Sequence, residues 1–340
     1  MVLAAEIVGK AKELGFDRCG IIPLGRLAPC ETKLKERIER FPETKERYEK
    51  LSGYAYPKKK YPWAESAVVC SFWYGKYYIP ENLRGRIGRY YLTDGRRMKA
   101  SEGYQTSVAF ERYLAGLGLR TACDREFGIT SLRWAAQEAG LGIIRKNNFF
   151  YTEKGSYQHL EVFLIDLPLE YILTCRLRAC PESCGLCLKA CPTRALAEPY
   201  AMNRNACVSD LTTWNGWDLT KEPLSGQTGD WIYGCDACQD ACPYNRQTME
   251  GEKEYPGLKE LSEKLSLIQI VEANYEYLEK VLQPVLWYIP AEKSWRYKTN
   301  ALNAMLNHYR PEYHSVIRKA CQDEKKPVRD MAKWVLKQLD

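Results

Sequence analysis

Two cysteine-rich stretches decide how this chain folds: CPESCGLCLKACP at residues 180–192 and CDACQDACP at residues 235–243. Each ends in a Cys-Pro pair that follows a three-residue gap, and Cys207 lies between the two stretches. From Cys180 to Cys242, cysteine, glycine and proline replace the hydrophobic periodicity of a helix or strand. We therefore expect this segment to be held by what its thiols bind rather than by a large core.

Together with Cys207, these stretches supply eight cysteines, which is the number that two cubane clusters need. In two-cluster ferredoxin folds, a C-x2-C-x2-C run gives three thiolates to one cluster, and the cysteine before proline crosses to the other. The pattern predicts a ferredoxin-like domain with two [4Fe–4S] clusters over residues 171–254. The first cluster would be held by Cys180, Cys184, Cys187 and Cys242, and the second by Cys191, Cys207, Cys235 and Cys238.

Two structural zinc sites are the alternative, because C-x2-C pairs also bind zinc. The three-residue gap before each Cys-Pro pair favours iron–sulfur clusters. A three-residue gap also separates Cys180 from Cys184, where a ferredoxin has two residues, so Cys175 is the alternative fourth ligand. The remaining cysteines are expected to be buried side chains without a metal; they are Cys19, Cys30, Cys70, Cys123 and Cys321.

The part of the chain before the cysteines alternates between helical and strand patterns. The strand candidates are residues 19–22, 67–74 and 160–167, and the helix candidates are residues 1–15, 31–50 and 130–139. The strand candidates are apolar runs, as expected for buried strands. This order predicts an α/β (α+β) domain over residues 1–170, in which helices cover a sheet.

The last part of the chain, residues 255–340, has only helical patterns. Apolar residues recur at helical spacing in three segments, at 302–309, 313–320 and 328–339. Short amphipathic helices in sequence cannot bury their apolar faces alone, so we expect one or two units of a helical-repeat stack.

Charge and hydropathy exclude a membrane protein. Fifty basic and forty-three acidic residues give a net charge of +7, which tolerates a polyanionic partner without demanding one. The longest apolar run, residues 67–74, is far shorter than the roughly 18 residues of a membrane span. Charged residues at helical spacing in residues 1–16 do not fit a secretory signal. We therefore expect a cytoplasmic protein with no membrane partner, whose clustered thiols bind metal.

The cysteine stretches and their neighbours resemble the epoxyqueuosine reductase family, cobalamin- and two-[4Fe–4S] enzymes of queuosine biosynthesis in tRNA that are related to reductive dehalogenases. The resemblance covers nearly the whole chain. In the cysteine region the resemblance lies at residues 184–196, 207–209 and 232–245. Before it, residues 139–147 are similar to the family's A-G-L-G-W-I-G-K-N, and residues 155–156 and 160–169 resemble the strand that follows. After it, residues 300–302 and 328–332 resemble the family's HEAT-like repeats.

The resemblance implies a base-off corrinoid without a histidine ligand from the protein. The chain has only three histidines, and none stands in a D-x-H-x-x-G context. Glycine lets backbone approach a ligand closely; capping of a helix is the alternative role for Gly140. The corrinoid-binding candidates are Gly140, Leu141, Gly142, Lys146 and Asn147.

The chain departs from the family at the acid that donates a proton. The family carries this aspartate in a V-D-[ST]-x-P-[IV]-L-E motif, whereas residues 122–133, ACDREFGITSLR, lack its proline and its glutamate. Counting back from Gly140 leads to Glu126, and Asp124 lies two residues away. Either carboxyl is a candidate to protonate the oxygen that leaves an epoxide, with Cys123 a weaker candidate. Solvated surface acids are the alternative.

Three functions follow from these patterns. The leading hypothesis is a corrinoid-dependent iron–sulfur reductase, fed by a low-potential electron donor, with an unidentified substrate, which could be a small molecule, a corrinoid protein or tRNA. The second is an electron-transfer protein that reduces a partner such as a corrinoid protein. The third is reduction of epoxyqueuosine in tRNA, since basic residues outnumber acidic ones by five over residues 291–340.

The resemblance also predicts an order of electron flow. The second cluster draws on the long segment between Cys207 and Cys235, whose Trp214, Trp217 and Trp231 are expected to shield it and to line the cofactor pocket. We therefore expect the second cluster to lie next to the corrinoid and the first to receive electrons from the donor.

Overall fold

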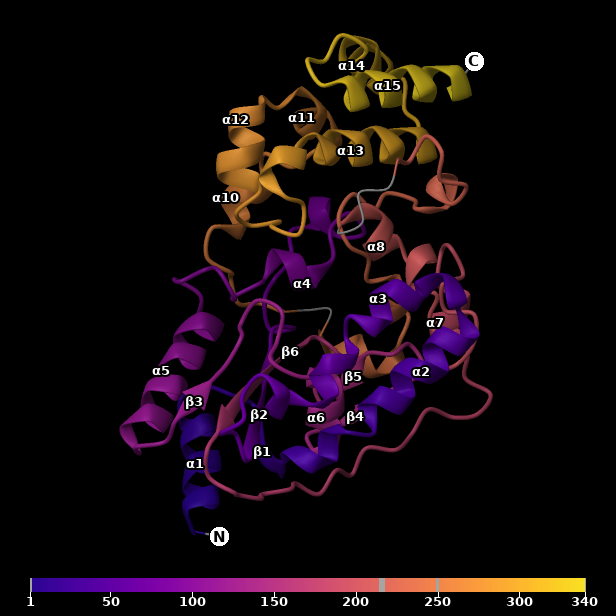
Figure 1. Ribbon diagram of the computed structural model, residues 1–340. Coiled ribbons are helices and arrows are strands. Elements are labelled where there is room, and N and C mark those ends of the chain that lie inside the picture. Colours follow the sequence, from indigo (N-terminus) through magenta and orange to yellow (C-terminus); the bar gives the residue numbers. More distant parts are fainter. Residues whose placement is uncertain (1, 214–217, 249–250, 340) are drawn as a thin grey trace.

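A four-stranded sheet lies at the N-terminal end of the molecule (Figure 1). The computed structural model describes residues 2–213, 218–248 and 251–339. The strands stand in the order β1-β2-β6-β3, and every neighbouring pair is antiparallel. Their bounds are Arg18–Pro23 for β1, Ser66–Trp73 for β2, Gln158–Ile165 for β6 and Thr121–Ala122 for β3. The three expected strands are thus present, and antiparallel pairing makes this part of the chain α+β.

Helices cover both faces of the sheet. Helices α1 (Val2–Glu13) and α5 (Glu102–Gly116) pack on one face, and α6 (Leu132–Glu138) packs on the other. Successive residues of a strand point to opposite faces; accordingly Val68 lies in the core beneath α1 and α5, whereas Val69 lies in the core beneath α6. Strand β2 is buried on both faces, which explains its unbroken apolar run.

The charged segment at residues 31–50 forms two helices instead of one. Helix α2 spans Cys30–Arg40, and α3 spans Lys45–Glu49. The break falls at Pro42, which lacks the N–H that a continuing helix needs. Smaller elements complete this part: α4 (Arg89–Leu92) and a ribbon of β4 (Ile143–Ile144) and β5 (Phe150–Tyr151).

The cysteine region contains only short helices in its described part. These are α7 (Leu186–Lys189), α8 (Val208–Thr212) and α9 (Ala237–Asp240). Helices α7 and α9 pack against each other, although some fifty residues separate them in sequence. The lack of long elements fits a segment organised by its thiols.

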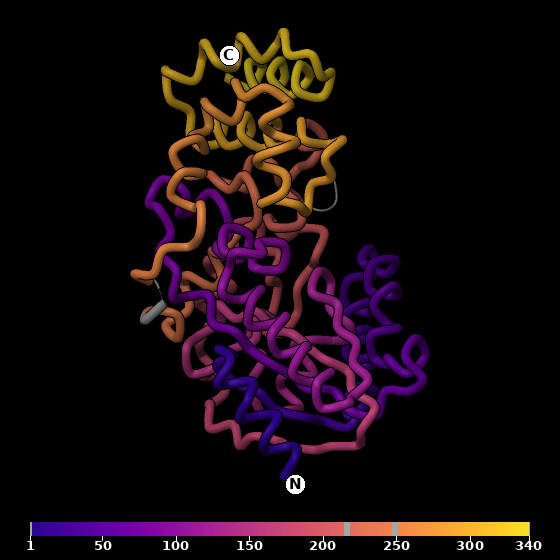
Figure 2. Tube along the Cα trace, turned by 90° about the vertical axis from the view of Figure 1, so that its left-hand side faces the viewer, coloured from indigo at the N-terminus to yellow at the C-terminus, as the bar shows by residue number. Residues whose placement is uncertain are grey.

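Six helices form the opposite end of the molecule, so the two termini lie far apart (Figures 1 and 2). Their bounds are Leu258–Ser262 (α10), Leu267–Glu272 (α11), Tyr275–Tyr277 (α12), Trp295–Asn307 (α13), Tyr313–Ala320 (α14) and Lys326–Leu339 (α15). Helix α15 packs on α13 and α14, and α11 packs on the same two helices. The three expected helices are present; their relation to HEAT repeats remains a prediction. Within the described residues, no helix is both long and apolar enough to cross a membrane.

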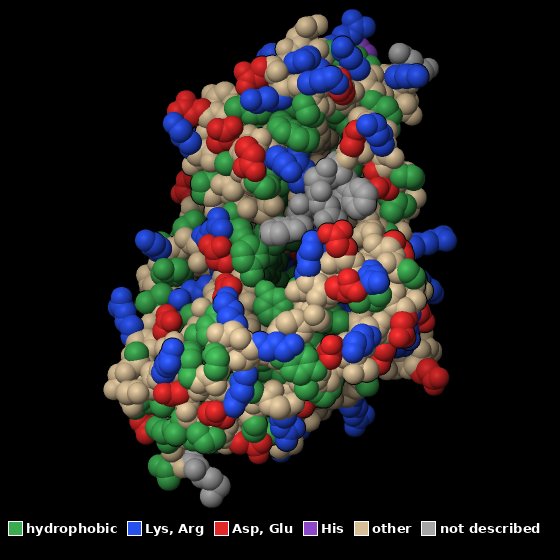
Figure 3. Space-filling view, in the orientation of Figure 1, with side chains coloured by type: hydrophobic (Ala, Val, Ile, Leu, Met, Phe, Trp, Pro, Cys, Tyr) green, Lys and Arg blue, Asp and Glu red, His purple; other side chains and the backbone are tan. Residues whose placement is uncertain are grey.

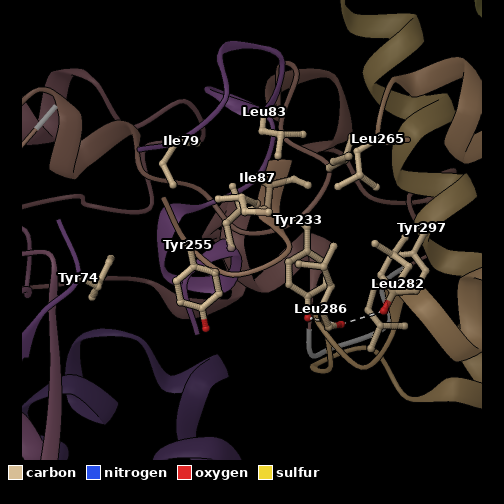
Figure 4. Close-up of a cluster of buried hydrophobic side chains, with 14 of the residues drawn as sticks. Tyr74, Ile79, Leu83, Ile87, Tyr233, Tyr255, Leu265, Leu282, Leu286 and Tyr297 are labelled. Atoms are coloured by element: carbon tan, nitrogen blue, oxygen red, sulfur yellow. Dashed lines mark hydrogen bonds between the residues drawn. The ribbon is translucent and has the colours of Figure 1, made fainter. Parts of the chain in front are cut away.

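One hydrophobic core joins the sheet to the C-terminal helices. Figure 4 shows its middle part, where Tyr233 and Tyr255 lie among aliphatic side chains from segments far apart in sequence. The hydroxyls of Tyr233 and Tyr297 both donate to the carbonyl oxygen of Leu286, at 2.7 and 2.8 Å. The predicted boundaries at residues 170 and 254 stay a prediction, but this core runs across both of them.

Candidate functional site

The four cysteines expected to hold the first cluster meet at one small cavity. Cys180, Cys184, Cys187 and Cys242 all line a cavity of about 160 Å³. The alternative ligand, Cys175, is not among the residues that line it. The crossing of Cys242 from the second stretch to the first is therefore present in the fold.

Two basic residues hold the loop that carries three of these thiols. The ammonium of Lys146 donates to the carbonyl oxygens of Pro181 and Glu182 at 2.7 Å and of Cys184 at 2.9 Å. The guanidinium of Arg145 lies 3.6 Å from the sulfur of Cys180. Charge-assisted hydrogen bonds of this kind fix a loop that lacks regular structure.

The other four cysteines form a second group. The thiols of Cys191, Cys207, Cys235 and Cys238 lie close enough to influence one another's ionisation. Burial raises the pKa of the Cys207 thiol to about 11 and the pKa values of Cys235 and Cys238 well above their usual range. Four thiolates cannot share such a site unless a cation compensates them, and a metal cluster supplies that charge. A four-thiolate cluster at each group stays our prediction, and the described residues contain no group of three or more ligating side chains that could hold a single metal ion.

A much larger cavity, of about 1000 Å³, lies between the sheet, α3, α5 and the segment that carries Tyr288. Residues of β2, α5 and β6 line it, together with the loop at 124–128 and Tyr288. A neighbouring cavity of about 810 Å³ shares part of its lining, including Tyr54, Tyr90 and Leu160. Figure 3 shows a hollow with hydrophobic side chains in the middle of one face of the molecule. Together the two cavities exceed the size of most small-molecule sites.

His159 is held within the wall of the large cavity. Its ring lies 4.5 Å from that of Tyr74 and 4.8 Å from that of Tyr90, between ring centres. Its Nε2 lies 3.3 Å from the carbonyl oxygen of Thr93, and burial lowers the pKa of His159 to about 4. The imidazole is therefore neutral at pH 7 and has a backbone partner in the cavity wall.

Both predicted catalytic carboxyls line the large cavity, but each is already engaged. Arg97 donates to both oxygens of Glu126, each at 2.9 Å. One oxygen of Asp124 accepts the backbone N–H groups of Glu126 and Phe127, each at 3.0 Å. Cys123, the weaker candidate, lies 3.3 Å from Glu111, and burial raises its pKa far above the usual range. A proton-donor role for Glu126 would first require its bidentate pair to break.

The predicted corrinoid-binding residues have other neighbours. Gly140 adopts a φ of +71° at the end of α6, and a Cβ at this position would overlap the carbonyl of Leu173. A Cβ at Gly142 would overlap the carbonyl oxygen of Tyr151. Leu141 is fully buried in the core beneath α6. The glycines are thus approached by the protein's own backbone.

Lys146 and Asn147 also lie away from the large cavity, at the cysteine region. Asn147 donates to the carbonyl oxygen of Cys238 at 3.1 Å and to the hydroxyl of Tyr151 at 2.8 Å. Neither residue is among those that line the large cavity. The corrinoid assignment of residues 140–142, 146 and 147 therefore stays a prediction, to which these contacts lend no support.

One residue of the cavity wall was missed by the sequence analysis. Glu161 lies on β6, and burial raises the pKa of its carboxyl to about 7. Its signal is an acidic residue within an otherwise apolar strand, a pattern that calls for a buried partner or a function. The expected tryptophan wall is only partly described: Trp214 and Trp217 lie outside the described residues, and Trp231 is buried but lines neither large cavity.

Two of the C-terminal basic residues are structural. Lys298 is buried and pairs with Asp323 at 2.8 Å, and the buried Arg296 donates to the carbonyl of Thr213. Lys333 and Lys337 on α15 are exposed. The basic excess of this region is therefore only partly available to a ligand.

Comparisons with known proteins support two iron–sulfur clusters in the cysteine region. Residues 179–245 match the family model described as a 4Fe-4S double cluster binding domain. An epoxyqueuosine reductase from Leadbetterella byssophila is 30% identical over 254 residues, which cover 71% of this chain and 79% of the relative. The chain belongs to the epoxyqueuosine reductase family. The fold agrees, because a crystal structure of epoxyqueuosine reductase with a tRNA-Tyr epoxyqueuosine-modified stem loop has a TM-score of 0.78 at 22% identity, covering 99% of this chain and 90% of that one.

Several epoxyqueuosine reductases match over a shorter part. The match to that of Cellulophaga algicola is 37% identical but spans only 33% of this chain and 36% of the relative. The match to that of Bacillus subtilis is 30% identical and spans 64% of this chain and 55% of the relative. A structure of the Bacillus subtilis enzyme, with its catalytic loop swung out of the active site, has a TM-score of 0.78 at 22% identity.

The contacts of Lys146 predict a selective effect on iron content. Lys146→Met leaves three carbonyl oxygens of the first cysteine loop without their donor. We expect the purified variant to hold about half the iron of the wild type, because the second cysteine group keeps its contacts. Lys189→Met, at an exposed lysine of α7 close to the same loop, is the matched control and should retain full iron content. Equal iron in both variants would contradict this role.

Proposed function

We propose that this chain is an iron–sulfur oxidoreductase that reduces epoxyqueuosine in tRNA to queuosine. The observation that carries the proposal is a large cavity next to the second cysteine group in a chain of the epoxyqueuosine reductase family. Arg204 and Asn205 line that cavity and precede Cys207 by only three and two residues. The likeness to a structure with an epoxyqueuosine-modified stem loop supports tRNA as the substrate.

A corrinoid is the cofactor that we propose for the two adjoining cavities. Their combined size suits a large tetrapyrrole, and the family resemblance implies a base-off form. Candidate contacts are Tyr54, Tyr90 and Leu160, which line both cavities. When bound, a corrinoid supplies low-potential electrons through its cobalt.

We propose that electrons enter at the first cysteine group and leave from the second. The first group lies at a small cavity rimmed by Leu186 and Tyr244, which are 47% and 44% exposed and offer a surface to a donor. The second group lies near the large cavity. Ser209, two residues after Cys207, shares a hydrogen bond of 2.9 Å with Tyr91, and Tyr90, which precedes Tyr91, lines that cavity. Direct exchange between the groups is favoured because each stretch contributes to both of them.

An electron carrier without a substrate of its own is the competing function. Such a protein needs an exposed cluster but no substrate cavity, whereas here a cavity of about 1000 Å³ is lined by Arg204 and Asn205, close in sequence to Cys207. This cavity favours the enzyme over the carrier.

The deciding experiment is anoxic turnover. Protein reconstituted with iron, sulfide and cobalamin is incubated with a chemical reductant and an epoxyqueuosine-containing tRNA stem loop, and the nucleoside is analysed by mass spectrometry. We expect loss of one oxygen atom from epoxyqueuosine and a base-off absorption spectrum of the bound cobalamin. Unchanged epoxyqueuosine would refute the substrate, and no cobalamin uptake in any redox state would refute the cofactor. Reduction of an added corrinoid protein without turnover would favour the carrier.

The exposed lysines of α15 predict how tRNA binds. Lys333→Gln and Lys337→Gln should each weaken binding of the stem loop and lower the slope of log affinity against log salt by about one, because each lysine that contacts a phosphate releases about one counterion. Glu260→Gln, at an exposed acid of α10, is the control and should leave the slope unchanged. Binding is measured by fluorescence anisotropy over a salt series. Unaltered slopes in both lysine variants would exclude α15 from the tRNA interface.

A further inference from the structure

A buried acidic network lies under α5, in the wall of the large cavity. Glu161 on β6 accepts a hydrogen bond from the hydroxyl of Ser107 at 2.6 Å. Arg125 donates through Nε to that same hydroxyl at 2.6 Å and through Nη2 to Glu111 at 2.5 Å. Its Nε is 3.5 Å from the Glu161 carboxyl. Ser107, Arg125 and Glu161 all line the cavity, so the network opens to its interior.

The charges of this network do not balance. One guanidinium, that of Arg125, faces two carboxyls, and its closer contact is with Glu111. Glu161 is only 16% exposed, and it lies opposite Cys70 of β2 in the strand register. Two carboxylates beside one cation in a poorly solvated site favour retention of one proton by the less well compensated carboxyl.

Among the residues that the structure describes, no second cation acts on Glu161. His159, two residues along β6 on the same face, has its pKa lowered to about 4 by burial and is neutral at pH 7. Cys70 and Cys123 are the remaining titratable groups near the network, and burial raises the pKa of each thiol well above its usual range. Phe16 and Phe72 contribute apolar surface to the same cavity. Among the described neighbours, Arg125 therefore acts as the nearby positive charge.

We infer that Glu161 is the proton donor to the oxygen that leaves the substrate, an inference that rests on the proposed function. In that reaction both C–O bonds of the epoxide break, a C=C bond forms, and the oxygen departs as water. Two electrons come from the low-potential donor through the metal centres, and two protons are consumed. Glu161 gives the first proton to the oxygen, and solvent provides the second and restores the acid.

Other carboxyls of the cavity are less suited to this step. Glu126 uses both oxygens to accept from Arg97, and Asp124 accepts two backbone N–H groups. Glu161 instead has one close hydrogen-bond donor, the Ser107 hydroxyl at 2.6 Å, while Arg125 is 3.5 Å away. Its carboxyl can therefore retain a proton. Ser107 is accordingly a positioning residue that holds the carboxyl toward the cavity.

The pH profile distinguishes a proton donor from a merely structural acid. Burial raises the pKa of Glu161 to about 7, while the Ser107 hydroxyl and Arg125 pull it down. The wild-type rate should therefore fall as pH rises above about 7, when the acid loses its proton. Glu161→Gln should lower turnover by about 100-fold or more and remove this pH dependence. Ser107→Ala should keep turnover at low pH and move the midpoint to higher pH, because a hydrogen bond that favours the carboxylate is lost.

A stability measurement tests the same group without turnover. Because the folded-state pKa exceeds the ordinary value of 4.5, the folded protein binds the extra proton, and the wild type should lose stability as pH rises from about 4.5 through 7. Glu161→Gln should flatten that decline in the thermal midpoint, while Glu6→Gln, at a surface carboxyl of α1, should not.

The outcomes separate the two proposals. A wild type that leaves epoxyqueuosine unchanged overturns both. An active wild type whose Glu161→Gln variant retains its rate and pH profile overturns the role of Glu161 alone. A 100-fold loss in Glu126→Gln or Asp124→Asn, with Glu161→Gln unaffected, also overturns it and assigns the proton to that carboxyl. Loss of turnover in Glu161→Gln with full iron content and unchanged circular dichroism, together with the shifted profile of Ser107→Ala, supports it.

Discussion

Replacing Cys238 by alanine is expected to abolish reduction of epoxyqueuosine even when a strong chemical reductant supplies the electrons. Cys238 belongs to the second cysteine group, which lies beside the large cavity through Arg204 and Asn205. In the proposed order every electron passes this group last, so no reductant that enters at the first group can bypass it. We expect a fall of at least about 100-fold in the single-turnover rate, measured under anoxic conditions.

Cys184→Ala is the matched variant in the first group. Its sulfur lines the small cavity near the exposed Leu186 and Tyr244. With a protein donor we expect a comparably large loss, whereas a small chemical reductant should reach the second group directly and restore most of the rate. Equal losses of both variants with both reductants would refute the order. Iron content near half that of the wild type, with unchanged circular dichroism, excludes misfolding as the cause.

The meeting of Cys242 with the first cysteine stretch was predictable because ligand spacing is a local property of the sequence. The gap before each Cys-Pro pair places three thiols on one turn and directs the fourth to the other stretch. Hence Cys242 meets Cys180, Cys184 and Cys187 at one cavity, although more than fifty residues separate it from them. The helical spacing of apolar residues was likewise sufficient to predict helices such as Tyr313–Ala320, whose apolar face is buried.

The cavity and its acid were not predictable in the same way. Glu161 accepts a hydrogen bond from Ser107, which lies 54 residues earlier in the chain, and this contact depends on how α5 packs on β6. Such a contact depends on the tertiary arrangement, which spacing along the chain does not determine. The carboxyls chosen by counting along a family motif, Asp124 and Glu126, lie at the same cavity, but their hydrogen bonds occupy them. The alternation of helix and strand patterns likewise could not predict the antiparallel order of the strands.

The two glycines after α6 illustrate a further limit. Glycine indicates that something approaches the backbone closely, but it does not identify what approaches. Here the carbonyls of Leu173 and Tyr151 occupy the space beside Gly140 and Gly142. The sequence analysis named a corrinoid as the approaching group, with helix capping as the alternative for Gly140; in the structure the protein's own backbone lies beside both glycines.

This packing predicts that Gly142→Ala destabilises the protein strongly even when no cofactor is present. A Cβ at residue 142 would overlap the carbonyl oxygen of Tyr151, which belongs to β5 and cannot move without its strand. We expect a loss of about 3 kcal/mol or more in the free energy of unfolding, since the backbone rather than a flexible side chain must shift.

Gly9→Ala is the matched control for this prediction. Gly9 lies within α1, is exposed, and has no heavy atom within 4 Å of an added Cβ. There the same substitution should stabilise the protein by up to about 1 kcal/mol, because alanine favours a helix over glycine. Chemical unfolding of both variants without cobalamin, followed by circular dichroism, makes the comparison. A Gly142→Ala variant as stable as the wild type that no longer takes up cobalamin would contradict the packing argument and return this glycine to the corrinoid site.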